Sequence, residues 1–108
     1  MKKPASKKRR GKSVSLEEAH LLKLKYHHEK WAVHVNAALA TNDLETILRV
    51  MGTISRARGM SIIAKRTGLS RENLYRSFGG GSSPTFETTV KLLKALGLRF
   101  TVRQIHTD

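Results

Sequence analysis

Arg71, Glu72, Tyr75 and Arg76 recur at a spacing that places them on one face of a helix. An arginine can direct two donors to O6 and N7 of guanine, which is the commonest specific contact in the DNA major groove. Tyr75 can contact a thymine methyl group or donate to a phosphate. Glu72 can accept from cytosine N4, or it can pair with Arg76 four residues later. The pattern is therefore typical of a helix that reads bases in a duplex.

Residues 60–79 provide two short helices that would position this face. Ala64 is a small residue at the predicted helix crossing, Gly68 tolerates a positive φ in the turn, and Leu74 holds the second helix on the core. Ser70 can cap that second helix. The stretch is interpreted as a helix-turn-helix motif. Its predicted DNA-binding residues are Ser61, Lys65, Arg66, Ser70, Arg71, Glu72, Asn73, Tyr75 and Arg76.

Basic residues around the first of these helices have a different predicted role. Lys65 and Arg66, with Arg56 and Arg58, are expected near phosphates, where they add affinity without sequence preference. The alternative is a solvated basic face. Ser61 is also expected to cap the first helix.

Composition restricts the partners. The 108 residues suffice for one domain, and 21 Lys and Arg against 8 Asp and Glu give a net charge of +13, which is typical of a nucleic-acid binder. Membrane binding is disfavoured because the basic segment uses its apolar residues for internal contacts. There is no cysteine, no run long enough to span a membrane, and no signal peptide after the basic start. A bacterial cytoplasmic protein acting on DNA is expected.

The N-terminal part is predicted to be a disordered basic arm over residues 1–14, followed by a helix over 15–40 that starts at a Ser15–Glu18 capping box. The arm is either a solubilising tail or a phosphate or minor-groove arm. The helix carries one apolar seam, which packs on its own chain, on a dimer mate or on another protein. Its predicted protein-partner residues are Leu21, Leu24, Trp31 and Val35, with Trp31 as the anchor.

Residues 41–97 are assigned to the helix-turn-helix domain. Thr41, Asn42 and Asp43 end the first helix and can cap the next, which runs to Gly59. After a glycine-rich loop at 79–84, Thr85 caps a further helix that ends at Gly97. The residues of this last helix expected to face inward are Phe86, Val90, Leu93 and Leu96.

The C-terminal part, 98–108, is predicted to be a strand and tail, because residues 98–103 alternate with a period of two. A lone strand would pair with the same strand of a second copy, so Leu98, Phe100 and Val102 are predicted to form a homodimer interface. The alternative is an irregular tail packed on the helices. A two-fold dimer implies an inverted-repeat operator with half-sites about 34 Å apart.

Other chemistry is not supported by the pattern. His20, His27 and His34 recur every seven residues, a spacing too long for one metal ion. No nucleophile elbow or paired carboxylates occur, so no catalytic residues, metal or cofactor are expected and the protein is not predicted to be an enzyme. An RNA-binding or ribosome-associated protein is the more serious alternative, although aromatic stacking residues are few.

The chain resembles the addiction-module antidote branch of the Cro/C1-type (XRE) helix-turn-helix proteins over roughly residues 36–103. The segments that carry this resemblance are Arg58-Gly59-Met60-Ser61, Ala64-Lys65, Thr67-Gly68-Leu69-Ser70-Arg71-Glu72, Leu74-Tyr75, Pro84-Thr85-Phe86-Glu87-Thr88 and Leu92-Leu93-Lys94-Ala95-Leu96-Gly97-Leu98. The resemblance implies a mainly α, five-helix repressor-like domain, here with a long N-terminal helix and a short C-terminal strand. It also implies an antitoxin that represses its own operon and neutralises a small RelE/HigB-like toxin. A stand-alone repressor without a toxin is the alternative.

Overall fold

The computed structural model describes residues 27–80 and 82–106. Within these ranges the chain is mainly α with five α-helices, as the sequence predicted, and it also has one short 3-10 helix that was not predicted. The elements are η1 (His28–Lys30), α2 (Trp31–Leu39), α3 (Leu44–Arg58), α4 (Met60–Thr67), α5 (Arg71–Phe78) and α6 (Phe86–Ala95). None of the helices in these ranges is long and apolar enough to cross a membrane.

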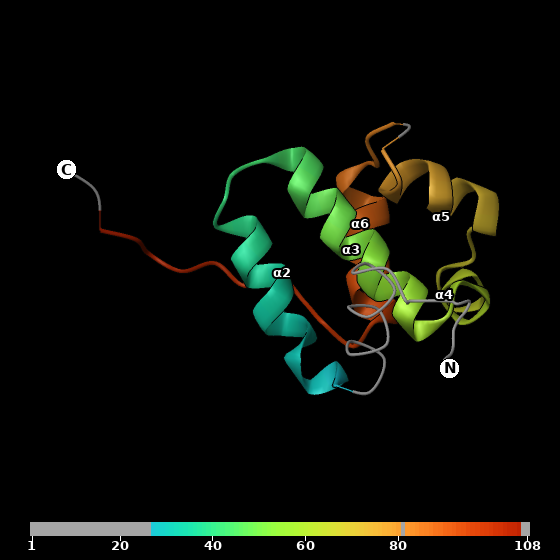
Figure 1. Ribbon diagram of the computed structural model, residues 1–108, viewed down its shortest axis with the longest axis horizontal. Coiled ribbons are helices and arrows are strands. Elements are labelled where there is room, and N and C mark those ends of the chain that lie inside the picture. Colours follow the sequence, from blue (N-terminus) through green and yellow to red (C-terminus); the bar gives the residue numbers. More distant parts are fainter. Residues whose placement is uncertain (1–26, 81, 107–108) are drawn as a thin grey trace, which may run out of the picture.

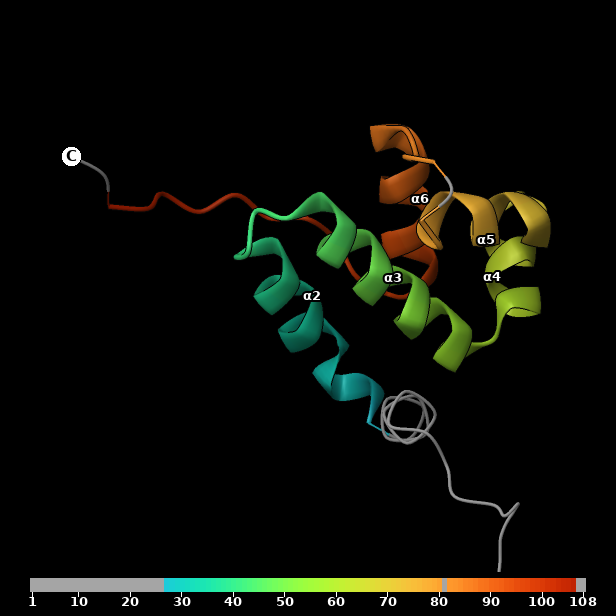
Figure 2. The ribbon, with the colours of Figure 1, turned by 45° about the horizontal axis from the view of Figure 1, so that its top comes forward.

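Helix α3 is the central element of the fold. It packs against α2 on one side and against α4 and α5 on the other, and α6 packs on α4. Both ribbon views show α2 separated by α3 from the α4–α5 pair (Figures 1 and 2). The helix pair predicted to read DNA therefore lies at one end of a single helical body.

One apolar core joins these helices. Met51 and Ile54 of α3, Ile63 of α4, Leu74 of α5 and Leu92 of α6 are each almost fully buried. Burying a side chain of this size contributes roughly 1.5–3 kcal/mol. Because every helix from α3 to α6 contributes to the same cluster, the position of each is fixed by the others.

Side-chain caps start α3 and α6 where the sequence predicted them. Asp43 Oδ2 accepts from the Thr46 amide at 3.2 Å, and Thr85 Oγ1 accepts from the Thr88 amide at 3.1 Å. The predicted cap at Ser61 is wrong, because α4 already begins at Met60 after Gly59 and has no side-chain cap. Gly59 makes this tight entry possible, since its φ of 113° is one that side chains rarely allow.

Only part of the predicted N-terminal helix lies in the described ranges. There, η1 is followed by α2, and the α-helix proper begins at Trp31 and ends at Leu39. The basic arm over 1–14 and the partner residues Leu21 and Leu24 lie outside the described residues.

The predicted C-terminal strand is wrong: residues 98–106 form no strand in the structure. The described part of the chain offers no second strand to complete a ladder. The apolar residues of the alternation pack on helices instead, with Leu98 and Phe100 against the core and the ring of Phe100 stacked 5.6 Å from that of Phe86. Val102, beyond these contacts, is fully exposed. Residues 98–106 thus follow the alternative of an irregular tail that begins packed on the helices.

Candidate nucleic-acid interface

The corner between α4 and α5 is a tight turn of residues 68–70. Gly68 has φ 77° and ψ 10°, the left-handed conformation that favours glycine, and its amide donates to the Ala64 carbonyl at 2.9 Å. Ser70 then adopts an extended backbone, and its Oγ accepts from the Asn73 amide at 3.0 Å. The turn glycine and the serine cap have the local roles predicted from the sequence.

Thr67 strengthens this corner in a way that the sequence reasoning missed. Its Oγ1 donates to the Ile63 carbonyl at 2.8 Å and accepts from the Leu69 amide at 3.2 Å. One hydroxyl therefore joins the last turn of α4 to the connecting residues, which reduces the freedom of α5 relative to α4.

The inner face of α5 is held firmly on α3. Leu74 is 0% exposed and Phe78 is 2% exposed. The Phe78 carbonyl lies so close to Gly52 that a Cβ there would be 2.4 Å from its oxygen. Gly52 was not singled out from the sequence, although a glycine inside a helical pattern is a signal of close packing. The contact fixes how closely α5 approaches the core.

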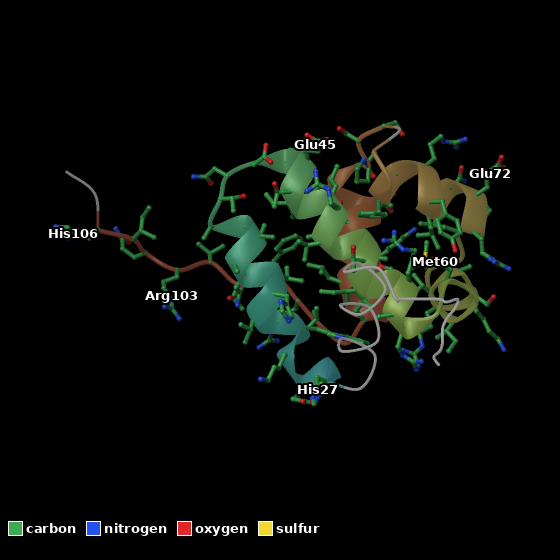
Figure 3. All side chains as sticks on the ribbon, viewed as in Figure 1. His27, Glu45, Met60, Glu72, Arg103 and His106 are labelled. Atoms are coloured by element: carbon green, nitrogen blue, oxygen red, sulfur yellow. The ribbon has the colours of Figure 1, made fainter. Side chains whose placement is uncertain are left out.

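The outer face of α5 carries the residues predicted to read bases. Arg71, Glu72, Asn73, Tyr75 and Arg76 are all exposed, with Tyr75 retaining 44% of its accessible surface. Figure 3 shows Glu72 at the outer edge of the molecule, at the opposite end from Arg103. The structure thus brings these five side chains together on one accessible surface, defined here as the α5 face.

Within the α5 face, Arg76 pairs with an amide rather than with an acid. Its Nη2 donates to Asn73 Oδ1, and not to Glu72 as the ion-pair interpretation predicted. Asn73 in turn is anchored by the bond from its backbone amide to Ser70. The guanidinium of Arg76 is consequently linked to the first turn of its own helix.

Among the residues predicted to contact phosphates, some are exposed and others have partners within the protein. Lys65 is exposed on α4, and so is Ser61, which was predicted to bind DNA but was not assigned to the phosphates. The guanidinium of Arg66 has a partner in its own chain, because its Nη1 donates to the Ala95 carbonyl at 2.9 Å. Arg56 is half-buried and its Nη2 donates to Thr53 Oγ1 at 3.3 Å, while Arg58 is also half-buried. Lys65 is therefore the member of this set best placed for a partner.

The predicted protein-partner anchor is not on the surface. Trp31 and Val35 are each only 5% exposed and belong to the core cluster. This corrects their assignment, because a side chain committed to the core has no free surface for another protein. The described half of the seam follows the alternative in which it packs on its own chain.

An apolar groove of about 600 Å³ lies instead between α6 and the segment that follows it. Phe86 and Val90, which were predicted to face inward, are 72% and 40% exposed and line it. Leu93 and Leu96 are buried as predicted, but Leu92 and Ala95 complete the buried stripe in place of Phe86 and Val90. Of the predicted dimer residues, Leu98 and Phe100 line the groove as well, and Val102 does not.

The described acids form no site of their own. The pKa of Asp43 is lowered because the Thr46 hydroxyl and then the Thr46 amide donate to its carboxylate, which serves as a helix cap. Within residues 27–80 and 82–106, no three His, Asp or Glu side chains gather closely enough to hold a metal ion.

Residues 15–104 match the family described as probable addiction module antidote protein. The chain belongs to this family. An uncharacterized protein of Haemophilus influenzae is 45% identical over 76 residues, which cover 70% of this chain and 78% of that protein. No solved structure matches the chain. Membership in the antidote family implies a toxin as partner, and the match spans both the helix-turn-helix segment and the groove.

Proposed function

We propose that this antidote is a sequence-specific DNA-binding antitoxin of the Cro/C1 type. As a homodimer it binds an inverted repeat in its own operon and represses it, and it neutralises a RelE/HigB-like toxin. The observation that carries the DNA-binding part is the contrast between the two sides of α5. Leu74 is completely buried while Arg71, Glu72, Tyr75 and Arg76 remain exposed beyond a glycine corner.

This arrangement suits the way in which helix-turn-helix proteins recognise DNA. The second helix enters the major groove and its N-terminal residues meet the base edges, while the first helix crosses the backbone. Arg71 is the first residue of α5 and so belongs to the N-terminal part of the helix that would meet the base edges. Lys65, on α4, would contact a phosphate and add affinity for any sequence.

The charge of the chain supports the same partner. A net charge of +13 favours association with a polyanion, and each neutralised phosphate releases counterions from the duplex. Within residues 60–79 of the helix-turn-helix, Glu72 is the sole acid beside Lys65, Arg66, Arg71 and Arg76. Affinity for random duplex should therefore fall steeply with salt, whereas discrimination between sequences should depend on the α5 face.

The test compares the duplex upstream of the gene with a random duplex of equal length, by fluorescence anisotropy at several salt concentrations. Arg71→Ala should reduce the binding free energy by about 1–3 kcal/mol and relax the base preference at one operator position, whereas Lys65→Ala should weaken binding to all sequences alike. Arg103→Ala is the charge-matched control, because Arg103 is exposed at the opposite end of the molecule (Figure 3).

Equal losses for the operator and the random duplex with both Arg71→Ala and Lys65→Ala would refute α5 as the recognition helix. RNA that displaces the operator at matched salt would favour the alternative of an RNA-binding protein. The antitoxin part is tested with the protein encoded beside this gene. If that protein is not inhibited by this chain, a stand-alone repressor is the better description.

A further inference from the structure

The groove beside α6 combines large exposed apolar side chains with a fixed shape. Phe86 keeps 72% of its surface accessible, yet its ring stacks on that of Phe100 with an interplanar angle of 17°. Val90 lies one helical turn further along α6 and lines the same groove. Apolar residues that are scattered singly over a surface are ordinary, but a contiguous set around a hollow is typical of a binding surface.

The far wall of the groove is held in place by the end of α6. The Gly97 amide donates to the Lys94 carbonyl at 3.0 Å, and the Leu98 amide donates to the Leu93 carbonyl at 2.8 Å. Gly97 has φ 79°, so these two bonds form the glycine-terminated helix end known as the Schellman motif. The groove is therefore preformed, and a partner need not order it on binding.

Charge decides what kind of segment fits. Lys94 and Arg99 line the groove, and its other lining residues are apolar or glycine. On α6 itself, Glu87 is engaged with Lys91 at 3.7 Å. An apolar segment carrying Asp or Glu would complement this lining, whereas the same groove of a second copy would bring Lys94 and Arg99 against like charge.

We propose that this groove is the docking site for the toxin, through an apolar toxin segment that carries acidic side chains. The proposal rests on the antitoxin role given above and identifies the surface that performs it. It also replaces the buried Trp31 and Val35 with accessible residues. Since none of the groove residues belongs to the α5 face, toxin and DNA occupy different surfaces, and a groove variant keeps its affinity for the operator.

The experiment titrates the purified protein encoded beside this gene into the full-length chain by calorimetry. Phe86→Ala should weaken the complex at least about tenfold, as loss of a central aromatic anchor usually does. Leu44→Ala is the matched control, because Leu44 is an exposed apolar residue on α3 outside the groove, and it should leave the affinity unchanged. Lys94→Glu should also weaken the complex, and reversing an acidic residue on the toxin segment to Lys should restore it.

The failures of the two ideas are distinguishable. If Phe86→Ala and Lys94→Glu bind the toxin as tightly as the unaltered chain, the groove proposal is wrong and the antitoxin role stands. If the unaltered chain binds no toxin, the antitoxin role fails and the groove proposal fails with it. If Phe86→Ala converts dimers to monomers in sedimentation equilibrium while toxin affinity is unchanged, the groove joins two copies and the proposal is overturned.

Discussion

Gly52 of α3 faces the backbone of Phe78, the last residue of α5, so closely that a Cβ at Gly52 would lie 2.4 Å from the Phe78 carbonyl oxygen. At this point the backbone of α5 packs directly on the backbone of α3, because Gly52 has no side chain to separate them. This contact lies behind the α5 face and determines how far that face projects from the core.

Replacing Gly52 with Ala should destabilise the protein even though Ala is the better helix former. The propensity gain of about 1 kcal/mol is opposed by overpacking, which typically costs about 1–3 kcal/mol and is at the upper end when the obstacle is backbone. The free energy of unfolding, measured in urea, should fall. Arg49→Ala on the same helix removes only an exposed pair with Glu45 at 3.7 Å and should change it by less than about 0.5 kcal/mol. A Gly52→Ala variant as stable as the parent would show that the helices can separate without cost.

The local signals in the sequence were sufficient to place the starts of three helices. Asp43, Ser70 and Thr85 each have a side-chain oxygen three residues before an amide that needs a partner, and a helix starts after each one. Gly68 likewise marks the corner. These signals act over one turn of chain, so they can be recognised without knowledge of the tertiary structure.

Contacts between distant segments were not predictable in the same way. Residues 98–103 have the alternation of a strand, but a strand needs a partner that a sequence cannot supply by itself, and packing on Phe86 and Leu93 replaced the ladder. By helical periodicity alone, Phe86 and Val90 are as suitable for the inward face of α6 as Leu92 and Ala95 are. Only the packing of α6 on the other helices, α4 foremost, determines which stripe is covered.

Arg66 illustrates the same limit at the candidate site, since its guanidinium joins α4 to the last residue of α6, a contact that the sequence did not indicate. The C-terminal end of a helix favours a cation, so this bond should stabilise the protein by about 1 kcal/mol. Arg66→Ala should therefore lower the urea midpoint, while Lys65→Ala should leave it unchanged and weaken binding to random duplex. Identical stability of the two variants would indicate that the Arg66–Ala95 bond has no energetic weight.

Asn73 is expected to act as a positioning residue for Arg76. Its side-chain Oδ1 accepts from the Arg76 guanidinium, and its backbone amide donates to Ser70 Oγ. Asn73→Ala should therefore release the arginine side chain without removing it. The preference for the base that Arg76 contacts should relax, whereas affinity for random duplex should stay the same. The double variant Asn73→Ala/Arg76→Ala should lose little more affinity for the operator than Arg76→Ala alone. Additive losses from the two substitutions would show that Asn73 contacts DNA independently.

Asp43 should make the stability of the protein dependent on acidic pH. Its pKa is lowered in the folded state, first by the Thr46 hydroxyl and then by the Thr46 amide, both of which donate to the carboxylate. For a group with a lowered folded pKa, the stabilisation is fully present above the unfolded value and is lost as pH falls through the folded one.

Asp43→Asn keeps an oxygen that can cap α3 but has no proton to gain. Urea midpoints taken from neutral pH down to pH 2 should therefore fall less for Asp43→Asn than for the parent. Thr46→Ala, which removes the largest cause of the shift, should flatten the profile of the parent but not that of Asp43→Asn. Parallel profiles for the parent, the two single variants and the double variant would place the acid sensitivity elsewhere in the chain.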